Sequence, residues 1–177
     1  ANREEFVTGM LPPLLSEVRR LTTDRGDTIK FLWKLHDGAL VESVLMRYPG
    51  RITLCVSSQA GCGMNCPFCA TGQAGLTRNM SAAEIVDQVV RANALIRAGE
   101  LGEPEHPDER VTNIVFMGMG EPLLNYAQVV RACNILLDTN GLSFSTRRVT
   151  ISTSGIVPRI YDLGNDLNTQ LAISLNA

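Results

Sequence analysis

Several features that mark particular protein classes are missing from this sequence of 177 residues. No apolar run approaches the roughly 18 residues that a membrane-spanning helix needs. The N-terminus also lacks the charged, apolar and small-residue pattern of a secretory signal. Internal repeats and low-complexity segments are absent too. We therefore expect a cytoplasmic protein without membrane contact.

A strong charge of one sign is also lacking. The formal net charge is −2, and no long basic run occurs. The electrostatic footprint that is typical of a nucleic-acid binder is therefore absent, so an RNA partner must be argued from other features. With 45% apolar and 19% charged residues, the chain is ordinary for one globular domain with a substantial core.

Histidine is scarce and cysteine is unevenly spread. The five cysteines are an odd number, which argues against a secreted disulfide framework. Three of them, Cys62, Cys66 and Cys69, follow a C-x3-C-x2-C spacing inside a segment that contains Gly61, Gly63 and Pro67. These turn residues suit a tight loop that aims three thiolates at one point. The spacing predicts a compact metal site.

The kind of metal site follows from the ligand count. Structural zinc normally has four nitrogen or sulfur ligands, but His36 and His106 both lie more than 25 positions from the cysteines. An iron–sulfur cluster held by three cysteines would leave one iron open for a substrate or cofactor. We favour the cluster. Three unconnected structural thiols are the alternative, although buried cysteines have no reason to crowd a glycine-containing loop.

The first part of the chain predicts a lead-in segment followed by a hairpin. We interpret residues 1–27 as the remnant of an N-terminal accessory region, with a helical apolar stripe that prolines interrupt, formed by Phe6, Met10, Leu14, Leu15, Val18 and Leu21. Residues 28–50 alternate between apolar and polar side chains on both sides of Asp37-Gly38, which predicts a β-hairpin.

Two residues near this hairpin have open interpretations. Glu42 shares its strand face with Leu40, Val44 and Met46. If that face is buried, the carboxylate would have a raised pKa and suit a general base; otherwise it is an edge-strand glutamate in solvent. Cys55 lies in the next predicted strand, seven positions before Cys62, and is either a packing residue or a reactive thiol.

The remaining sequence, residues 51–177, alternates between strand and helix patterns. Ser81 and Glu84 form an S-x-x-E capping box that predicts a helix from Ala82 to near Gly99. A strand over residues 111–117, buried on both faces, precedes a helix that Asn125 and Gln128 can cap. Strand, helix and strand follow over residues 148–175. This order predicts an α/β fold with right-handed crossovers and a parallel sheet.

A glycine-rich turn follows the buried strand. In Gly118-Met119-Gly120-Glu121-Pro122, the glycines allow close approach of a ligand at the carboxyl end of a strand. Glu121 would then accept a hydrogen bond from an amino group of that ligand. A plain turn is the alternative.

Several segments together resemble one family from about residue 28 to the end. They are Cys55–Cys62 (CVSSQAGC), the cysteine triplet, Phe116–Leu123 (FMGMGEPL), Val149–Gly155 (VTISTSG) and Leu171–Leu175 (LAISL). These motifs, in this order, resemble the RlmN/Cfr family of radical S-adenosylmethionine (SAM) RNA adenine methyltransferases, and the wording is closer to RlmN. The resemblance implies an incomplete (β/α)6-type partial barrel preceded by the hairpin.

The resemblance also implies roles for matching residues. Cys62, Cys66 and Cys69 would hold a [4Fe–4S] cluster whose open iron binds SAM. Glu42 matches the proton acceptor, and Cys55 matches the cysteine that pairs transiently with a methyl-carrying cysteine. Contacts to SAM would come from Gly120, Glu121, Ser152, Ser174, Leu175 and Asn176.

The implied reaction is methylation of adenine C2 in RNA, and the sequence leaves open whether 23S rRNA, tRNA or both are the substrates. One SAM methylates the carrier cysteine, and a second is cleaved to a 5′-deoxyadenosyl radical that removes hydrogen from the methyl group. The resulting carbon radical attacks the adenine ring, which is too weakly nucleophilic at C2 for polar transfer. An external electron donor would reduce the cluster, and the complete enzyme would be monomeric.

Two departures from the family pattern affect these expectations. We expect the carrier cysteine beyond Ala177, and most of the N-terminal RNA-binding region is also missing. Asn176 stands where the family has histidine. This chain alone is therefore expected to be inactive, as a metal- or SAM-binding module. The remaining alternatives are another radical SAM reaction and a zinc- or RNA-binding module.

Overall fold

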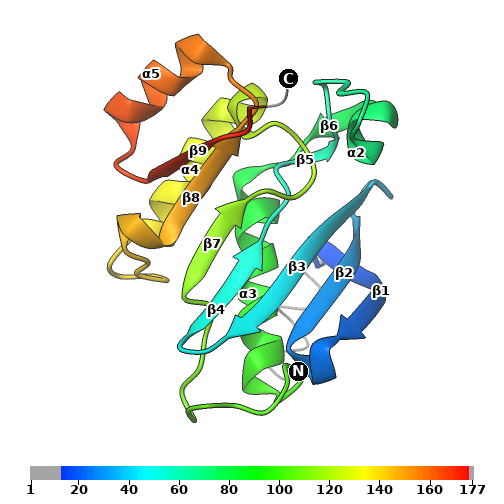
Figure 1. Ribbon diagram of the computed structural model, residues 1–177, viewed down its shortest axis with the longest axis vertical. Helices are drawn as coiled ribbons and strands as arrows, with labels where there is room; N and C mark the ends of the chain where they lie inside the picture. Colours follow the sequence, from blue (N-terminus) through cyan, green and yellow to red (C-terminus); the bar gives the residue numbers. More distant parts are fainter. Residues whose placement is uncertain (1–12, 176–177) are drawn as a thin grey trace, which may run out of the picture.

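The computed structural model describes residues 13–175, which form a seven-stranded sheet covered by helices on one side. The strand order is β1-β2-β3-β4-β7-β8-β9 (Figure 1). The strands are β1 (Leu15–Thr23), β2 (Thr28–Leu35), β3 (Leu40–Tyr48), β4 (Arg51–Cys55), β7 (Asn113–Phe116), β8 (Val149–Thr153) and β9 (Gln170–Ile173). The first four pair antiparallel, and β4, β7, β8 and β9 pair parallel.

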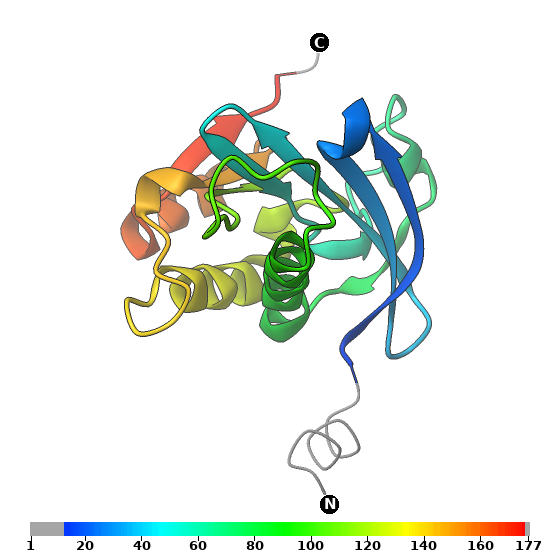
Figure 2. The same cartoon turned by 90° about the horizontal axis from the view of Figure 1, so that it is seen from below.

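Helices connect the parallel strands. The long ones are α3 (Ala82–Arg97), α4 (Tyr126–Leu137) and α5 (Val157–Asp166), with one-turn 3-10 helices η1 (Asp24–Gly26), η2 (Pro122–Asn125) and η3 (Thr146–Arg148). Figure 2 shows α3 and α4 packed against one side of the sheet. The predicted α/β partial barrel is confirmed. Within residues 13–175, no helix is long and apolar enough to cross a membrane.

Local sequence signals account for several element boundaries. The hairpin of β2 and β3 closes at Asp37 and Gly38, and the Asp37 carboxylate accepts a hydrogen bond from the Ala39 N–H (3.1 Å). Helix α3 begins at Ala82 as predicted. The Ser81 hydroxyl accepts from the Glu84 N–H, and the Glu84 carboxylate accepts from the Ser81 N–H, which completes the capping box.

The helical stripe predicted at the start of the chain is wrong where the structure can be compared with it. Phe6 and Met10 lie outside the described residues, but Leu15, Val18 and Leu21 lie in β1. Leu15 pairs with Leu35 and is fully buried, whereas Val18 is 52% exposed at a bulge. Pairing with β2 satisfies backbone hydrogen bonds that a proline-interrupted helix would leave partly unmade.

The two faces of the sheet differ in burial. On β2 and β3 the face toward the helices contains Phe31, Trp33, Val41 and Leu45, all at most 2% exposed. Their neighbours in sequence point to the opposite side, which we call the open face. The prediction that residues 111–117 are buried on both faces is wrong, since Met117 is 52% exposed there.

Two predicted helix caps have other partners. Asn125 precedes α4, but its side-chain amide donates to the Ser58 and Met80 carbonyls at 2.8 Å instead of accepting from α4. The Gln128 side chain accepts from the Ala82 N–H (3.0 Å) and so caps the neighbouring helix α3. Each side-chain amide therefore links two structural elements, and neither caps helix α4.

Candidate cluster and cofactor site

A separate two-stranded ribbon carries the three clustered cysteines. Strands β5 (Gln59–Gly61) and β6 (Leu76–Asn79) pair antiparallel, and the loop between them includes the short helix α2 (Ala70–Gln73). The Cys62 N–H donates to the Gly75 carbonyl (2.9 Å) at the base of the loop. Gly61 has φ +79°, and a β-carbon there would lie 2.0 Å from that carbonyl oxygen. Glycine is therefore required for the loop to close.

The cysteine loop contains the local reversals that its sequence predicts. Asn65 has φ +51°, and the Cys69 N–H donates to the Cys66 carbonyl (3.1 Å). All three cysteines of the loop are half-buried, and none forms a disulfide. Burial, followed by the nearby Cys66, Cys69 and Glu121, raises the pKa of the Cys62 thiol.

The three cysteines line one cavity of about 370 Å³ together with residues at the carboxyl ends of the parallel strands. The opposite wall comes from the Gly118–Glu121 turn and from the ends of β8 and β9. Of the predicted cofactor residues, the cavity brings together the three cysteines with Gly120, Glu121, Ser152 and Ser174.

The donor set fits a cluster better than a single metal ion. Across the part of the chain that the structure describes, no three His, Cys, Asp or Glu side chains converge on one ion position. A cubane cluster binds each thiolate through a different iron atom, so its cysteines need not converge on one point. His36 and His106 line two other cavities. The cavity therefore offers three sulfur ligands without a histidine to complete a zinc tetrahedron.

The glycine turn lies directly against the segment that follows β4. A β-carbon at Gly118 would lie 2.7 Å from the Ser57 hydroxyl oxygen. At Gly120, where φ is +99°, it would lie 2.5 Å from the β-carbon of Gln59. Both glycines are needed for this close approach, which brings the turn to the rim of the cavity.

Glu121 organises the turn from inside the protein. The residue is 4% exposed, and its carboxylate accepts hydrogen bonds from the Leu123 N–H (3.0 Å) and from the N–H and hydroxyl of Ser154 (both 2.9 Å). These hydrogen bonds show that Glu121 stabilises the turn itself, which was the alternative to a ligand contact. Because Glu121 also lines the cavity, a ligand amino group would be an additional partner for a carboxylate that is already held in place.

The predicted SAM residues near the end of the chain differ in position. The Ser152 and Ser174 hydroxyl oxygens lie 3.5 Å apart on the cavity wall. Leu175 is 90% exposed and does not line the cavity. Asn176 lies outside the described residues.

Glu42 and Cys55 lie on the open face beside the cavity and not within its lining. Strand β3 is an interior strand, so the edge-strand alternative is wrong, and the Glu42 carboxylate pairs with the Lys30 ammonium at 2.9 Å. The Glu42 side chain is 39% exposed, so its face is not the buried apolar surface that a desolvated base requires. Burial raises the pKa of the half-buried Cys55 thiol. Cys133, on the core face of α4, is fully buried.

Sequence patterns do not single out the residues that support the glycine turn. Ser57 and Gln59 are fully buried, and the Gln59 side chain accepts from the Glu121 N–H (2.9 Å) and donates to the Asn79 side chain (2.7 Å). The Gln88 amide holds both the N–H and the carbonyl of Ser57 at 3.0 and 2.9 Å. The sequence offered one signal for this support: Gln88 is a polar residue between the core positions Ile85 and Val89 of α3.

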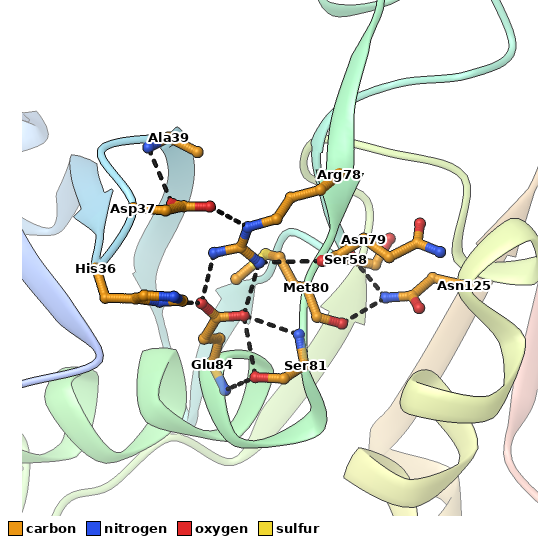
Figure 3. Close-up of polar contacts among 10 residues, drawn as sticks. All are labelled: His36, Asp37, Ala39, Ser58, Arg78, Asn79, Met80, Ser81, Glu84 and Asn125. Atoms are coloured by element: carbon orange, nitrogen blue, oxygen red, sulfur yellow. Dashed lines mark hydrogen bonds and ion pairs between the residues drawn. The ribbon is translucent and has the colours of Figure 1, made fainter.

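A polar network fixes the base of the ribbon (Figure 3). The Arg78 guanidinium on β6 donates to both carboxylate oxygens of Glu84 at 2.8 and 3.0 Å, and it pairs with Asp37 in the hairpin turn. The His36 ring nitrogen lies 3.4 Å from Glu84. Burial alone would raise the pKa of Glu84, but hydrogen bonds from Arg78 and Ser81 outweigh it and lower that pKa. Arg78 lowers the pKa of Asp37 to about 2.

Relatives of known sequence and structure agree with this arrangement. The Radical SAM superfamily matches residues 56–177. A probable dual-specificity RNA methyltransferase RlmN from Streptomyces coelicolor is 58% identical over 179 residues, which cover 99% of this chain and 48% of the relative. The protein of the same name from Kocuria rhizophila is 56% identical over 178 residues, with 99% and 47% covered. The chain thus spans about half the length of these relatives.

A solved structure shows the same fold. The crystal structure of a radical SAM methyltransferase from Sphaerobacter thermophilus superposes with a TM-score of 0.88 at 44% identity, and the match covers 100% of this chain and 51% of that one. The resemblance that the sequence motifs predict is confirmed. The chain belongs to the radical SAM superfamily, in its RlmN/Cfr branch.

Proposed function

We propose that this chain provides the cluster- and SAM-binding half of an enzyme that methylates adenine C2 in RNA. The substrates would be 23S rRNA and tRNA, in keeping with the dual-specificity RNA methyltransferases that it resembles. The observation that carries the proposal is the single cavity that three cysteines share with Gly120, Glu121, Ser152 and Ser174.

Cys62, Cys66 and Cys69 would hold a [4Fe–4S] cluster. The fit rests on three half-buried free thiols around one cavity, and on the absence of a converging single-ion site within residues 13–175. When bound and reduced, such a cluster supplies the electron that cleaves SAM and begins radical chemistry.

The cavity wall opposite the cysteines would orient SAM. Gly120 lets the turn pack directly against Gln59 at the cavity wall, and the Glu121 carboxylate is held in place by three protein hydrogen bonds. The Ser152 and Ser174 hydroxyls offer two adjacent hydrogen-bonding groups on β8 and β9. This preorganisation would lower the entropic cost of ordering the cofactor.

Glu42 and Cys55 would act on the open face beside this cavity. Glu42 would accept the proton that leaves adenine C2, and the Lys30 ammonium lies 2.9 Å from its carboxylate. The Cys55 sulfur would attack the sulfur of a methyl-carrying cysteine outside this chain and form a transient disulfide. The bond between that sulfur and the transferred carbon would break, and its electron pair would go to the carbon. Burial raises the pKa of the half-buried Cys55 thiol above its ordinary value.

Low-temperature EPR of the anaerobically reconstituted, dithionite-reduced chain tests this function. We expect a [4Fe–4S]+ signal that changes when SAM is added. Iron and sulfide content should be measured on the same samples. One zinc per chain without sulfide would instead support a zinc module and overturn the proposal.

The functional unit would also need groups that this chain does not supply. We propose a cytoplasmic location, since all five cysteines are free, as in a reducing compartment. An external electron donor would reduce the cluster.

Adenine methylation by this chain alone would overturn the view that the methyl-carrying cysteine lies elsewhere. A tritium-release assay on an RNA stem-loop labelled at adenine C2 would detect it.

A further inference from the structure

The open face of the sheet has a charge that differs from that of the whole chain. The net charge of the protein is −2, yet the strand residues that point to the open face include Arg19, Lys30 and Lys34. Among the seven strands of the main sheet, Glu42 provides the single carboxylate on that face. The other acidic strand residue, Glu17, pairs with Trp33 and belongs to the helix-covered side.

The register of the strands fixes how these charges are arranged. Arg19 of β1 pairs with Leu32 of β2, and Leu32 pairs with Glu42 of β3. Lys30 and Lys34 lie two positions before and after Leu32, so they share its face. Three cations therefore surround one apolar side chain, with Glu42 beside it.

These side chains are accessible to a large ligand. Arg19 and Lys34 are exposed, and neither forms an ion pair with any residue between 13 and 175. Together with Leu21, the residues Arg19, Lys30, Leu32 and Glu42 line a shallow depression of about 130 Å³. This hollow is too small for a folded partner to enter, but it suits an extended chain that lies across the strands.

We propose that Arg19 and Lys34 bind backbone phosphates of the single-stranded RNA segment that presents adenine to Glu42. The inference rests on the proposed function, which supplies RNA as the partner. Lys30 is already paired with Glu42, whereas the two other cations form no ion pair within residues 13–175. Phosphate contacts position RNA without reading its sequence, which fits a surface that must accept two kinds of RNA.

The charge arrangement also explains how an acidic protein can bind RNA. A local cluster of cations concentrates counterion release at one place, so the net charge of the chain need not be positive. The sequence does not reveal the cluster, because Arg19 comes from another strand than Lys30 and Lys34. It forms only when β1 pairs with β2.

The test measures how salt affects binding of a short RNA stem-loop with an unpaired adenine. In the 177-residue chain, the double variant Arg19→Ala/Lys34→Ala removes two cations from the open face. The matched control Arg97→Ala/Arg131→Ala removes two exposed arginines from α3 and α4, on the helix-covered side. Binding is followed by fluorescence anisotropy between low and moderate salt.

We expect the open-face variant to bind RNA several-fold more weakly, with the slope of log affinity against log salt reduced by about 1.4, or about 0.7 for each phosphate contact. The control should retain the parent slope. Equal slopes in parent and open-face variant, equal losses in both variants, or no RNA binding by the parent would overturn the proposal. Binding to phosphatidylserine vesicles without binding to RNA would identify a membrane surface instead and also overturn it.

A second readout separates this surface from the proposed function. The SAM-dependent change in the EPR signal should be the same in parent, open-face variant and control, because neither pair of residues lines the cluster cavity. If the SAM-dependent signal is present but the open-face variant keeps the parent's salt slope, the proposed RNA contacts are wrong and the proposed cofactor site is unaffected. If the signal is absent from the parent, the proposed function fails independently.

Discussion

The Ser57 hydroxyl donates a hydrogen bond to the carbonyl oxygen of Glu42 at an oxygen–oxygen distance of 2.5 Å. The same hydroxyl accepts from the Met119 N–H at 2.8 Å. One buried atom therefore joins strand β3, at the residue proposed as proton acceptor, to the glycine turn at the cofactor cavity. Removing it should leave a buried donor and a buried acceptor without partners.

This relationship predicts different effects for two adjacent serines. Ser57→Ala should lower the free energy of unfolding by about 2 kcal/mol, since two polar groups lose their partner. Ser58 is equally buried, but its hydroxyl has no hydrogen-bond partner within the described residues, so Ser58→Ala should change stability by less than about 0.5 kcal/mol. Urea titrations of both variants measure the difference. Equal destabilisation would show that the hydroxyl bridge contributes nothing specific.

The Arg78 network predicts a pH-dependent effect. Glu84 is 2% exposed, so Arg78→Met should remove the guanidinium that pairs with a buried carboxylate and lower stability by about 3 kcal/mol at neutral pH. The pKa of Glu84 is lowered from 4.5 in the folded chain, so its stabilisation is present above about pH 4.5 and is lost as the pH falls through the folded pKa. The gap between parent and variant should therefore narrow on acidification.

Urea midpoints of parent and variant, measured from about pH 7 down to about pH 3, check whether this gap in stability narrows. Arg159→Met is the matched control, because its pair with Asp162 is exposed and should contribute about 0.5 kcal/mol or less. A gap that stays constant with pH would contradict the proposed link between Arg78 and the charge of Glu84.

The cysteines predict a sharp division in metal content. Alanine at Cys62, Cys66 or Cys69 should reduce iron and sulfide after anaerobic reconstitution to near zero, because each thiolate is expected to bind its own iron atom. Cys55→Ala is the control, since this half-buried thiol lies in β4 and outside the cavity lining. Full cluster loading in Cys66→Ala, or loss in Cys55→Ala, would contradict the assignment.

Two glycines with positive φ predict unequal responses to alanine. Gly155 has φ +114° and open space around its missing β-carbon, so Gly155→Ala should cost about 1 kcal/mol through backbone strain alone. Gly120→Ala adds an overlap with Gln59 at 2.5 Å and should cost about 2 kcal/mol more. Thermal unfolding measures both costs. The SAM response should be lost in Gly120→Ala, and similar stability of both variants would show that the turn can move away from Gln59.

Local signals made much of the fold predictable. The hairpin turn and the capping box at Ser81 and Glu84 involve residues within a few positions of one another, so their chemistry is visible in the sequence. The three cysteines are equally local. For such features, the sequence contains both partners of each decisive interaction.

Features that depend on distant partners were not predictable in the same way. Strand β1 exists because Leu15 pairs with Leu35, twenty positions away, and its own apolar spacing resembles that of a helix. Gln128 was expected to cap its own helix but caps α3 through Ala82. The support of the glycine turn by Ser57 and Gln59 likewise appears only once β4 and β7 pair.

The β5–β6 ribbon carries the cysteine loop outside the main sheet, and several polar side chains hold its base. Among loop positions 62–75 only Gly72 is buried, in contrast to the apolar core beneath the sheet. The loop should therefore open as its own cooperative unit, with amide hydrogen exchange far faster than in β4 or β7. An oxidised or empty cluster site could then be refilled without unfolding the sheet that holds the rest of the protein.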